Sequence, residues 1–215
     1  MRLQNNARHM KRIVPFKVAM EKTSSDVGQE YFYGDSKKRD YRRAFPHLLD
    51  AALAGDAHCQ NLVGYCYDLG LGVKKDPKQA SIWYQGAAKQ EHKEALYNLA
   101  ILCEKGLGVE TNYRKAFLLY KRAADLGDAW AQCNLGVMYL EGTGTRQNIP
   151  EGMTWLRKAA RRGDAAAQYN IAIGYRDGVR ARRNLRLAKI WLRKASAQGH
   201  KKAAMVLKRL SARRR

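Results

Sequence analysis

The chain has 215 residues, of which 46% are hydrophobic, and it carries a formal net charge of +22 at pH 7. A chain of this size buries a substantial core, and without an apolar run of roughly 18 residues it contains no predicted transmembrane helix. The apolar run near the N-terminus is broken by Pro15 and Lys17, which excludes a signal-peptide core. We therefore predict one continuous, cytoplasmic domain.

In chain order, the sequence divides into four parts. Residues 1–18 form a basic segment that fits no repeat and that we expect to be flexible, and residues 19–54 form a degenerate first repeat. Residues 55–198 contain four repeats, and residues 199–215 form a C-terminal capping helix with a basic tail. The positions that fit the second helix of the degenerate repeat are Gly34, Asp40, Ala44, Ala51 and Ala52.

A period of 36 residues runs through the four central repeats, and each register keeps one kind of residue. The clearest registers are Gly70, Gly106, Gly142 and Gly178; Ala80, Ala116, Gly152 and Ala188; and Trp83, Leu119, Trp155 and Trp191. Self-similarity at this period indicates stacked supersecondary units that bury their apolar faces against one another. We predict an all-α fold, a right-handed α/α solenoid of helix-turn-helix repeats.

The repeat from 127 to 162 shows how one hairpin forms. Gly127 suits the left-handed end of the preceding helix, and Asp128 suits the N-cap of a helix over 129–141 that ends at Gly142. Asn148 is the expected N-cap of the second helix. At 90–92 the Gly-Asp pair is replaced by Glu91 and His92, so we predict that this junction is less well capped and flexes.

These residues resemble the Sel-1-like repeat, a relative of the tetratricopeptide repeat. The best copy holds Ala131, Leu135, Gly136, Tyr139, Gly142 and Gly144, then Trp155, Lys158, Ala159, Ala160 and Gly163. The resemblance implies a non-catalytic scaffold that needs no cofactor and binds a protein or peptide partner along the concave surface of the first helices. Some cysteine-rich secreted relatives carry a β-lactamase description, which leaves a β-lactam-binding enzyme as a remote alternative. Their paired cysteines and secretion signal are absent here.

The predicted partner-binding surface lies beside the packed stripe of each first helix. It combines aromatic anchors, amides and aliphatic side chains, which suit a peptide groove. The positions are Asn61, Leu62, Tyr65, Tyr97, Asn98, Ile101, Trp130, Cys133, Asn134, Val137, Tyr169, Asn170 and Ile173. An alternative interpretation is that Asn98, Asn134 and Asn170 recur because each braces a neighbouring hairpin.

The positive charge is concentrated in the last third of the chain. Residues 146–215 contain 20 Lys and Arg against 3 Asp and Glu, whereas residues 46–145 contain 10 against 11. The basic patch comprises Arg161, Arg162, Arg176, Arg180, Arg182, Arg183, Arg186, Arg193 and Lys194. This asymmetry favours an acidic protein partner, and a polyanion or nucleic acid is the alternative partner. A merely solvated basic face explains the same residues.

The sequence offers no constellation for catalysis or metal binding. Its five histidines keep no recurring spacing to an acid, and no HExxH, GxSxG or P-loop pattern occurs. The repeated GxG pairs follow predicted helices and are read as turns. The cysteines Cys59, Cys66, Cys103 and Cys133 are not spaced as a zinc site, and we predict buried free thiols in a reducing compartment.

Overall fold

The computed structural model describes residues 22–34, 38–178 and 181–212, and within them it contains eleven α-helices and no strand. The predicted flexible segment, 1–18, lies outside the described residues. The helices are α1 (Ser24–Tyr33), α2 (Tyr41–Leu53), α3 (Ala57–Leu69), α4 (Pro77–Lys89), α5 (Lys93–Lys105), α6 (Tyr113–Asp125), α7 (Ala129–Glu141), α8 (Ile149–Arg161), α9 (Ala165–Asp177), α10 (Leu185–Ala197) and α11 (Lys201–Ala212).

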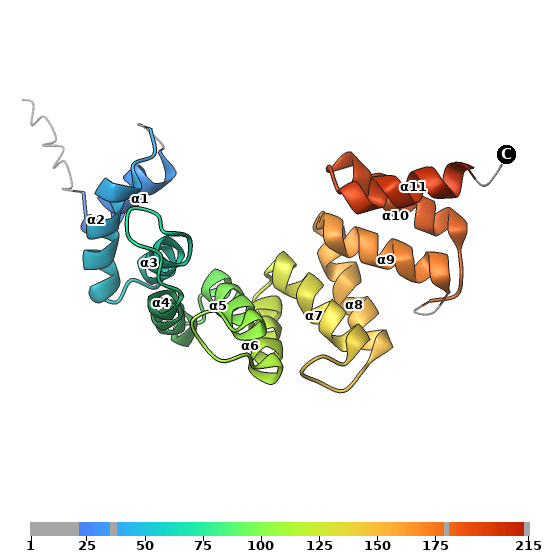
Figure 1. Ribbon diagram of the computed structural model, residues 1–215, viewed down its shortest axis with the longest axis horizontal. Coiled ribbons are helices and arrows are strands. Elements are labelled where there is room, and N and C mark those ends of the chain that lie inside the picture. Colours follow the sequence, from blue (N-terminus) through green and yellow to red (C-terminus); the bar gives the residue numbers. More distant parts are fainter. Residues whose placement is uncertain (1–21, 35–37, 179–180, 213–215) are drawn as a thin grey trace, which may run out of the picture.

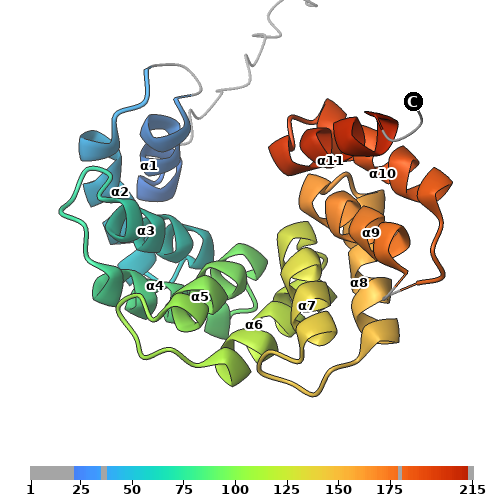
Figure 2. The same cartoon turned by 45° about the vertical axis from the view of Figure 1, so that its right-hand side comes forward.

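The helices form antiparallel hairpins that stack side by side into an arc (Figure 1). The turned view shows that the odd-numbered helices line the inner, concave side and the even-numbered helices the outer side (Figure 2). Each helix packs against its partner in the hairpin, and each hairpin packs against the next. The buried apolar residues form four clusters that follow one another along the arc. The predicted all-α solenoid of helical hairpins is confirmed.

Helix ends fall where the capping residues predict. The Asp128 carboxylate accepts the backbone N–H of Ala131 at 2.7 Å, and α7 ends at Gly142, whose φ of 74° closes the helix in the left-handed region. Asn148 caps α8 by accepting the N–H of Glu151 at 3.1 Å. The predicted helix over 129–141 and its two caps are therefore confirmed.

The junction at 90–92 is capped by different residues, and its N-cap hydrogen bond, at 3.4 Å, is longer than the 2.6–2.9 Å of the caps made by Asp56, Asp128 and Asp164. That the junction flexes stays a prediction. Glu91 itself adopts a positive φ of 58°, and the Nδ1 atom of His92 accepts the N–H of Ala95 at 3.4 Å. The carboxylate of Glu91 also forms an ion pair with Arg122 of the next hairpin. An imidazole thus replaces the usual aspartate as N-cap, and the salt bridge ties the unusual residue to the neighbouring repeat.

Close approach of neighbouring helices depends on small residues. The pairs Ala87-Ala88, Ala123-Ala124 and Ala159-Ala160 are all buried. Where α7 crosses α8, a Cβ added to Gly152 would lie 2.7 Å from the carbonyl oxygen of Gly136. A larger side chain at this crossing would force the two helices apart and expose the apolar side chains around them.

The four cysteines Cys59, Cys66, Cys103 and Cys133 are buried and unpaired. Burial disfavours the thiolate and raises the pKa of each thiol, in the case of Cys66 to about 12. A buried thiol with a raised pKa is a poor nucleophile and packs as a small apolar group. The prediction of buried free thiols is confirmed.

The second glycine of each GxG loop packs against the start of the preceding outer helix. A Cβ at Gly108 would lie 2.3 Å from the carbonyl carbon of Pro77, and Gly72 and Gly144 make the equivalent approach to Tyr41 and Tyr113. These glycines also have positive φ values near 70°. The loops therefore join successive hairpins through backbone contacts that no larger residue allows.

We predict that replacing Gly108 by Ala destabilises the fold more than replacing Gly55. Both glycines have positive φ, but a Cβ at Gly55 meets nothing within 4 Å. Gly55→Ala should lower the free energy of unfolding by roughly 1 kcal/mol through strain alone. Gly108→Ala should lower it by about 3 kcal/mol, because a clash with rigid backbone is added. Urea denaturation measures both values, and equal losses would contradict the packing role of the loop.

Candidate functional site

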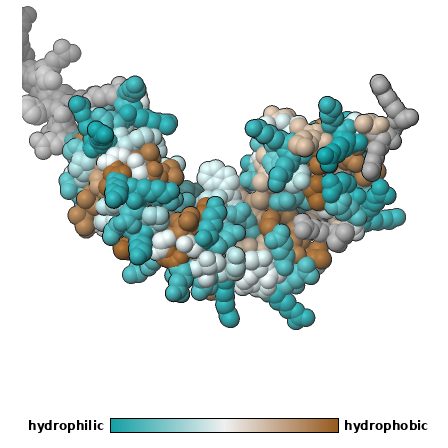
Figure 3. Space-filling view, viewed as in Figure 1, coloured by the Kyte–Doolittle hydropathy of each residue, from teal (hydrophilic) through white to brown (hydrophobic). Residues whose placement is uncertain are grey.

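The inner surface of the arc is the candidate site, and it is formed by the odd-numbered helices (Figure 2). Trp130, at the second position of α7, is 60% exposed, and Tyr65 on α3 is 39% exposed. The remaining predicted positions that are half-buried on these helices are Tyr97, Asn98, Ile101, Asn134, Val137, Tyr169, Asn170 and Ile173. Figure 3 shows the hollow of the arc, with apolar residues interleaved among hydrophilic ones.

Three predicted surface positions, Asn61, Leu62 and Cys133, are instead buried. Cys133 packs in one cluster with Ala167 and Ile171 of the following inner helix. The periodicity of a single helix identifies only its packed stripe, whereas one flank of the remaining surface is covered by the next hairpin. The surface open to a partner is therefore narrower than the sequence predicted.

Aromatic contacts join successive hairpins along the inner surface. The rings of Tyr97 and Trp130 have centroids 5.9 Å apart, and Tyr169 stacks on His200, the residue before α11, at 4.7 Å. Tyr33 stacks on His58 at 6.4 Å. Sequence reasoning missed both histidines, although His58 occupies the same repeat register as Trp130. These pairs hold large flat side chains in place, which lowers the entropy lost when a partner binds.

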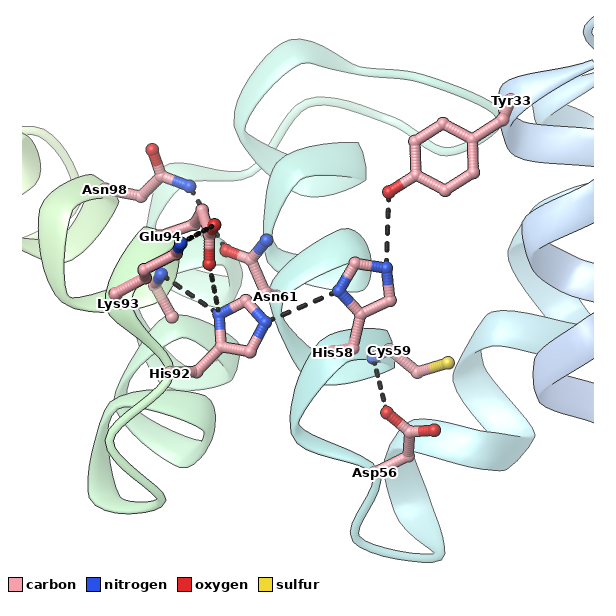
Figure 4. Close-up of polar contacts among 10 residues, drawn as sticks. Tyr33, Asp56, His58, Cys59, Asn61, His92, Lys93, Glu94 and Asn98 are labelled. Atoms are coloured by element: carbon pink, nitrogen blue, oxygen red, sulfur yellow. Dashed lines mark hydrogen bonds and ion pairs between the residues drawn. The ribbon is translucent and has the colours of Figure 1, made fainter. Parts of the chain in front are cut away.

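A polar network crosses three hairpins near the N-terminal end of this surface (Figure 4). The Tyr33 hydroxyl lies 3.2 Å from Nε2 of His58, and Nδ1 of His58 lies 3.4 Å from Nε2 of His92. Nδ1 of His92 lies 3.4 Å from a carboxylate oxygen of Glu94. In Figure 4 the two imidazoles point toward each other between α3 and the start of α5.

The inner-surface asparagines contact neighbouring hairpins. The amide of Asn98 donates to the side-chain oxygen of Asn61 at 3.1 Å. Asn134 lies beside the Tyr120 hydroxyl, which donates to Glu104 at 2.7 Å, and Asn170 lies beside the thiol of Cys133. The interpretation of these amides as braces between repeats is therefore supported, and part of their hydrogen-bonding capacity is already used within the fold.

Burial is the main cause that lowers the pKa of His92 below its usual value of 6.5. The neighbouring His58 lowers this pKa further, whereas Glu94 opposes the shift. The neutral form suits the structure, because the N-cap needs a lone pair on Nδ1 to accept the N–H of Ala95. Protonation would remove that acceptor and place a second charge near Lys93.

The basic patch lies on α8, α9, α10 and the loop before α10. Seven of its predicted members are exposed, namely Arg161, Arg162, Arg182, Arg183, Arg186, Arg193 and Lys194. Arg176 pairs with Asp177 on α9, the Arg162 guanidinium donates to the Gly127 carbonyl, and Lys194 lies 4.8 Å from the Trp191 ring centroid. Arg180 lies outside the described residues. Most of these cations thus belong to α8, α10 and the adjoining loops, whereas Arg176 shares the inner helix α9 with Tyr169.

Comparison with known proteins agrees with the architecture. The model of the Sel1 repeat matches residues 25–56, 57–92, 93–128, 131–164 and 165–200. A Sel1 repeat protein from Oxalobacter formigenes superposes with a TM-score of 0.80 at 29% identity, covering 86% of this chain and 73% of that one. The structure of c5321, a protective antigen present in uropathogenic Escherichia coli strains, superposes with a TM-score of 0.78 at 29% identity, covering 86% of this chain and 39% of that one.

One curated relative is chitin synthase regulatory factor 4 of Schizosaccharomyces pombe, which is 36% identical over 83 residues. The match covers 37% of this chain and 12% of that protein, so the chain spans only a small part of its length. The hairpin arc and its repeated caps define a helical-repeat solenoid. The chain belongs to the Sel1 repeat family, whose members are typically non-catalytic scaffolds for protein–protein interaction.

No helix in the described ranges combines the length and the apolar character required to cross a membrane.

We predict that the stability of the protein falls as the pH drops below about 6.5, because unfolded His92 takes up a proton more readily than folded His92. The loss should reach at most about 1.4 kcal/mol per pH unit. His92→Asn keeps an oxygen that accepts the N–H of Ala95 but does not titrate there. Thermal unfolding between about pH 7 and pH 5 should show a weaker dependence for the variant. If the unmodified protein and His92→Asn show the same pH dependence of thermal unfolding, His92 is not the cause of that dependence.

Proposed function

We propose that the protein is a non-catalytic scaffold that binds an extended segment of a partner protein along its inner surface. The observation that carries this proposal is Trp130, a large aromatic side chain left 60% exposed near the middle of the concave side and held against Tyr97. Exposing such a side chain forgoes the free energy of its burial, and buried tryptophans are frequent anchors in interfaces.

The chemistry around Trp130 suits a peptide. Val137 follows it along α7, and Ile101 occupies the same register as Val137 one repeat earlier, so the inner surface offers both aromatic and aliphatic contacts. Asn98 and Asn134 are half-buried beside them, and each amide retains donors or acceptors beyond the brace it forms. An extended backbone can pair with such amides while its side chains pack on the aromatic rings.

The basic C-terminal third supplies the second element of the proposal. Residues 146–215 hold 20 cationic residues against 3 acidic ones, and such a field steers an acidic partner toward the scaffold. The same charge favours one other candidate, a polyanion or nucleic acid bound through its phosphates. Four unpaired cysteines accord with a reducing compartment, and we propose that the scaffold acts in the cytoplasm.

Replacing Trp130 by Ala tests the inner surface. We expect partner capture to be lost while the free energy of unfolding falls by less than about 1 kcal/mol, since most of the side chain is already in solvent. The matched control is Tyr113→Ala on the outer helix α6, because Tyr113 is 49% exposed. Partners are captured from the native cells by affinity purification and identified by mass spectrometry. A protein captured by the unmodified chain and by Tyr113→Ala should be missing only with Trp130→Ala.

The capture is divided into nuclease-treated and untreated halves to decide between the two partner classes. A protein that persists after nuclease treatment and disappears with Trp130→Ala supports the scaffold. Nucleic acid in the eluate, together with proteins that vanish after nuclease treatment, would assign function to the basic third instead. A large drop in melting temperature for Trp130→Ala would reassign Trp130 to the core.

A further inference from the structure

A groove of about 570 Å³ lies at the C-terminal end of the arc, between α10 and α11. Its apolar part is formed by Leu185, Ile190 and Leu210, and its charged part includes Arg186, Lys189 and Arg193. None of the described residues that line it is acidic. Leu185 and Ile190 are both 39% exposed, which is high for aliphatic side chains at the junction of two packed helices.

The helical periodicity of α10 explains why the groove is lined by both apolar and cationic side chains. Arg186, Lys189, Ile190 and Arg193 recur at spacings of three and four, so they share one face of the helix. The opposite face carries Ala188, Leu192 and Ala195, which are fully buried against neighbouring helices. α10 therefore has one face in the core and a second, cationic and partly apolar face in the groove.

In an earlier repeat, the loop of the following hairpin packs on part of this face. The start of α6 receives the loop glycine Gly144 of the following repeat, and the α6 residue Phe117 adjoins the same loop. Phe117 is buried there, whereas Lys189 occupies its register in α10 and is only half-buried. The register of Ile190 is exposed in earlier repeats too, at 57% for Ile82 and 53% for Leu118. What distinguishes this face of α10 is the cation Lys189, which replaces Ser81, Phe117 and Met153 of the earlier repeats.

The sequence of α11 does not favour another repeat as the occupant. Lys208 stands in the register of Gly64, Ala100, Gly136 and Ala172. A Cβ at Gly64 or Gly136 would meet the second helix of the same hairpin, at Tyr84 or Leu156, within 3 Å. A lysine in this register blocks the packing that a further outer helix would need, and Lys208 is exposed.

We propose that this groove binds an acidic, amphipathic helix of a partner protein. Leucine-like side chains on one face of that helix would contact Leu185, Ile190 and Leu210, and carboxylates on its flanks would pair with the surrounding Arg and Lys. A nucleic acid fits less well, because none of the lining residues is aromatic and the exposed aliphatic side chains have no counterpart in a phosphate backbone.

This inference deepens the proposed scaffold function, since it gives the basic end a partner class and a site. Its test is independent of the inner surface. The probe is a fluorescently labelled synthetic peptide designed as a helix with leucines on one face and glutamates on the other. A scrambled peptide of the same composition and a single-stranded oligonucleotide serve as comparison probes. Fluorescence anisotropy with the full chain measures the affinity for each.

The repeats supply matched control variants. Ile190→Ser in the groove is paired with Ile82→Ser, because Ile82 has the same register on α4 and is 57% exposed. Arg186→Glu is paired in the same way with Lys78→Glu. Each groove variant should lower the affinity for the amphipathic peptide about tenfold, which corresponds to about 1.4 kcal/mol of binding free energy. The control variants and Trp130→Ala should leave that affinity unchanged.

Two results would overturn the proposal. In the first, Arg186→Glu weakens binding of the amphipathic peptide but Ile190→Ser does not, and the oligonucleotide binds more tightly than the peptide. This result would show that the surface recognises charge alone. The other is the lack of saturable binding of the amphipathic peptide, or equal binding of the scrambled one. Neither result bears on partner capture through Trp130. The groove proposal can therefore fail while the scaffold proposal holds, and the two failures are distinguishable.

Discussion

Close contact between successive hairpins is the constraint on which the structure depends. A single hairpin leaves one side of each helix uncovered, so the core exists only because the next hairpin packs against it. Glycine and alanine at the crossings, such as Gly136 and Gly152, allow this approach, and loop glycines such as Gly108 fix the contact through the backbone. The curvature that forms the inner surface follows from repeating one such contact along the chain.

The same constraint determines which residues remain available for binding. Side chains on the flank facing the next hairpin, such as Cys133, become core, while Trp130 and Tyr65 lie where the arc is open. Polar groups caught between hairpins are satisfied by one another, as in the contacts of His58 with His92 and of Asn98 with Asn61. The inner surface therefore combines a braced polar end with an exposed aromatic centre.

The charge distribution divides the molecule in a second way. The aromatic centre lies in the nearly neutral part of the sequence, whereas the excess of Lys and Arg belongs to the last two hairpins and α11. At that end Lys208 replaces a small residue, and the exposed Leu185 and Ile190 of α10 lie beside Arg and Lys side chains. Two surfaces with different chemistry thus occur on one rigid scaffold, which suits a protein that joins partners.

The sequence by itself determined the repeats, the helix boundaries and nearly every cap, because these depend on periodicity and on neighbours a few residues away. Asp128, Gly142 and Asn148 were all assigned correctly from local signals. The tertiary structure alone decided that His92 caps α5, that Asn61, Leu62 and Cys133 are buried, and that a groove opens beside α10. These features depend on the angle and spacing between successive hairpins, which no single repeat encodes in its own periodicity.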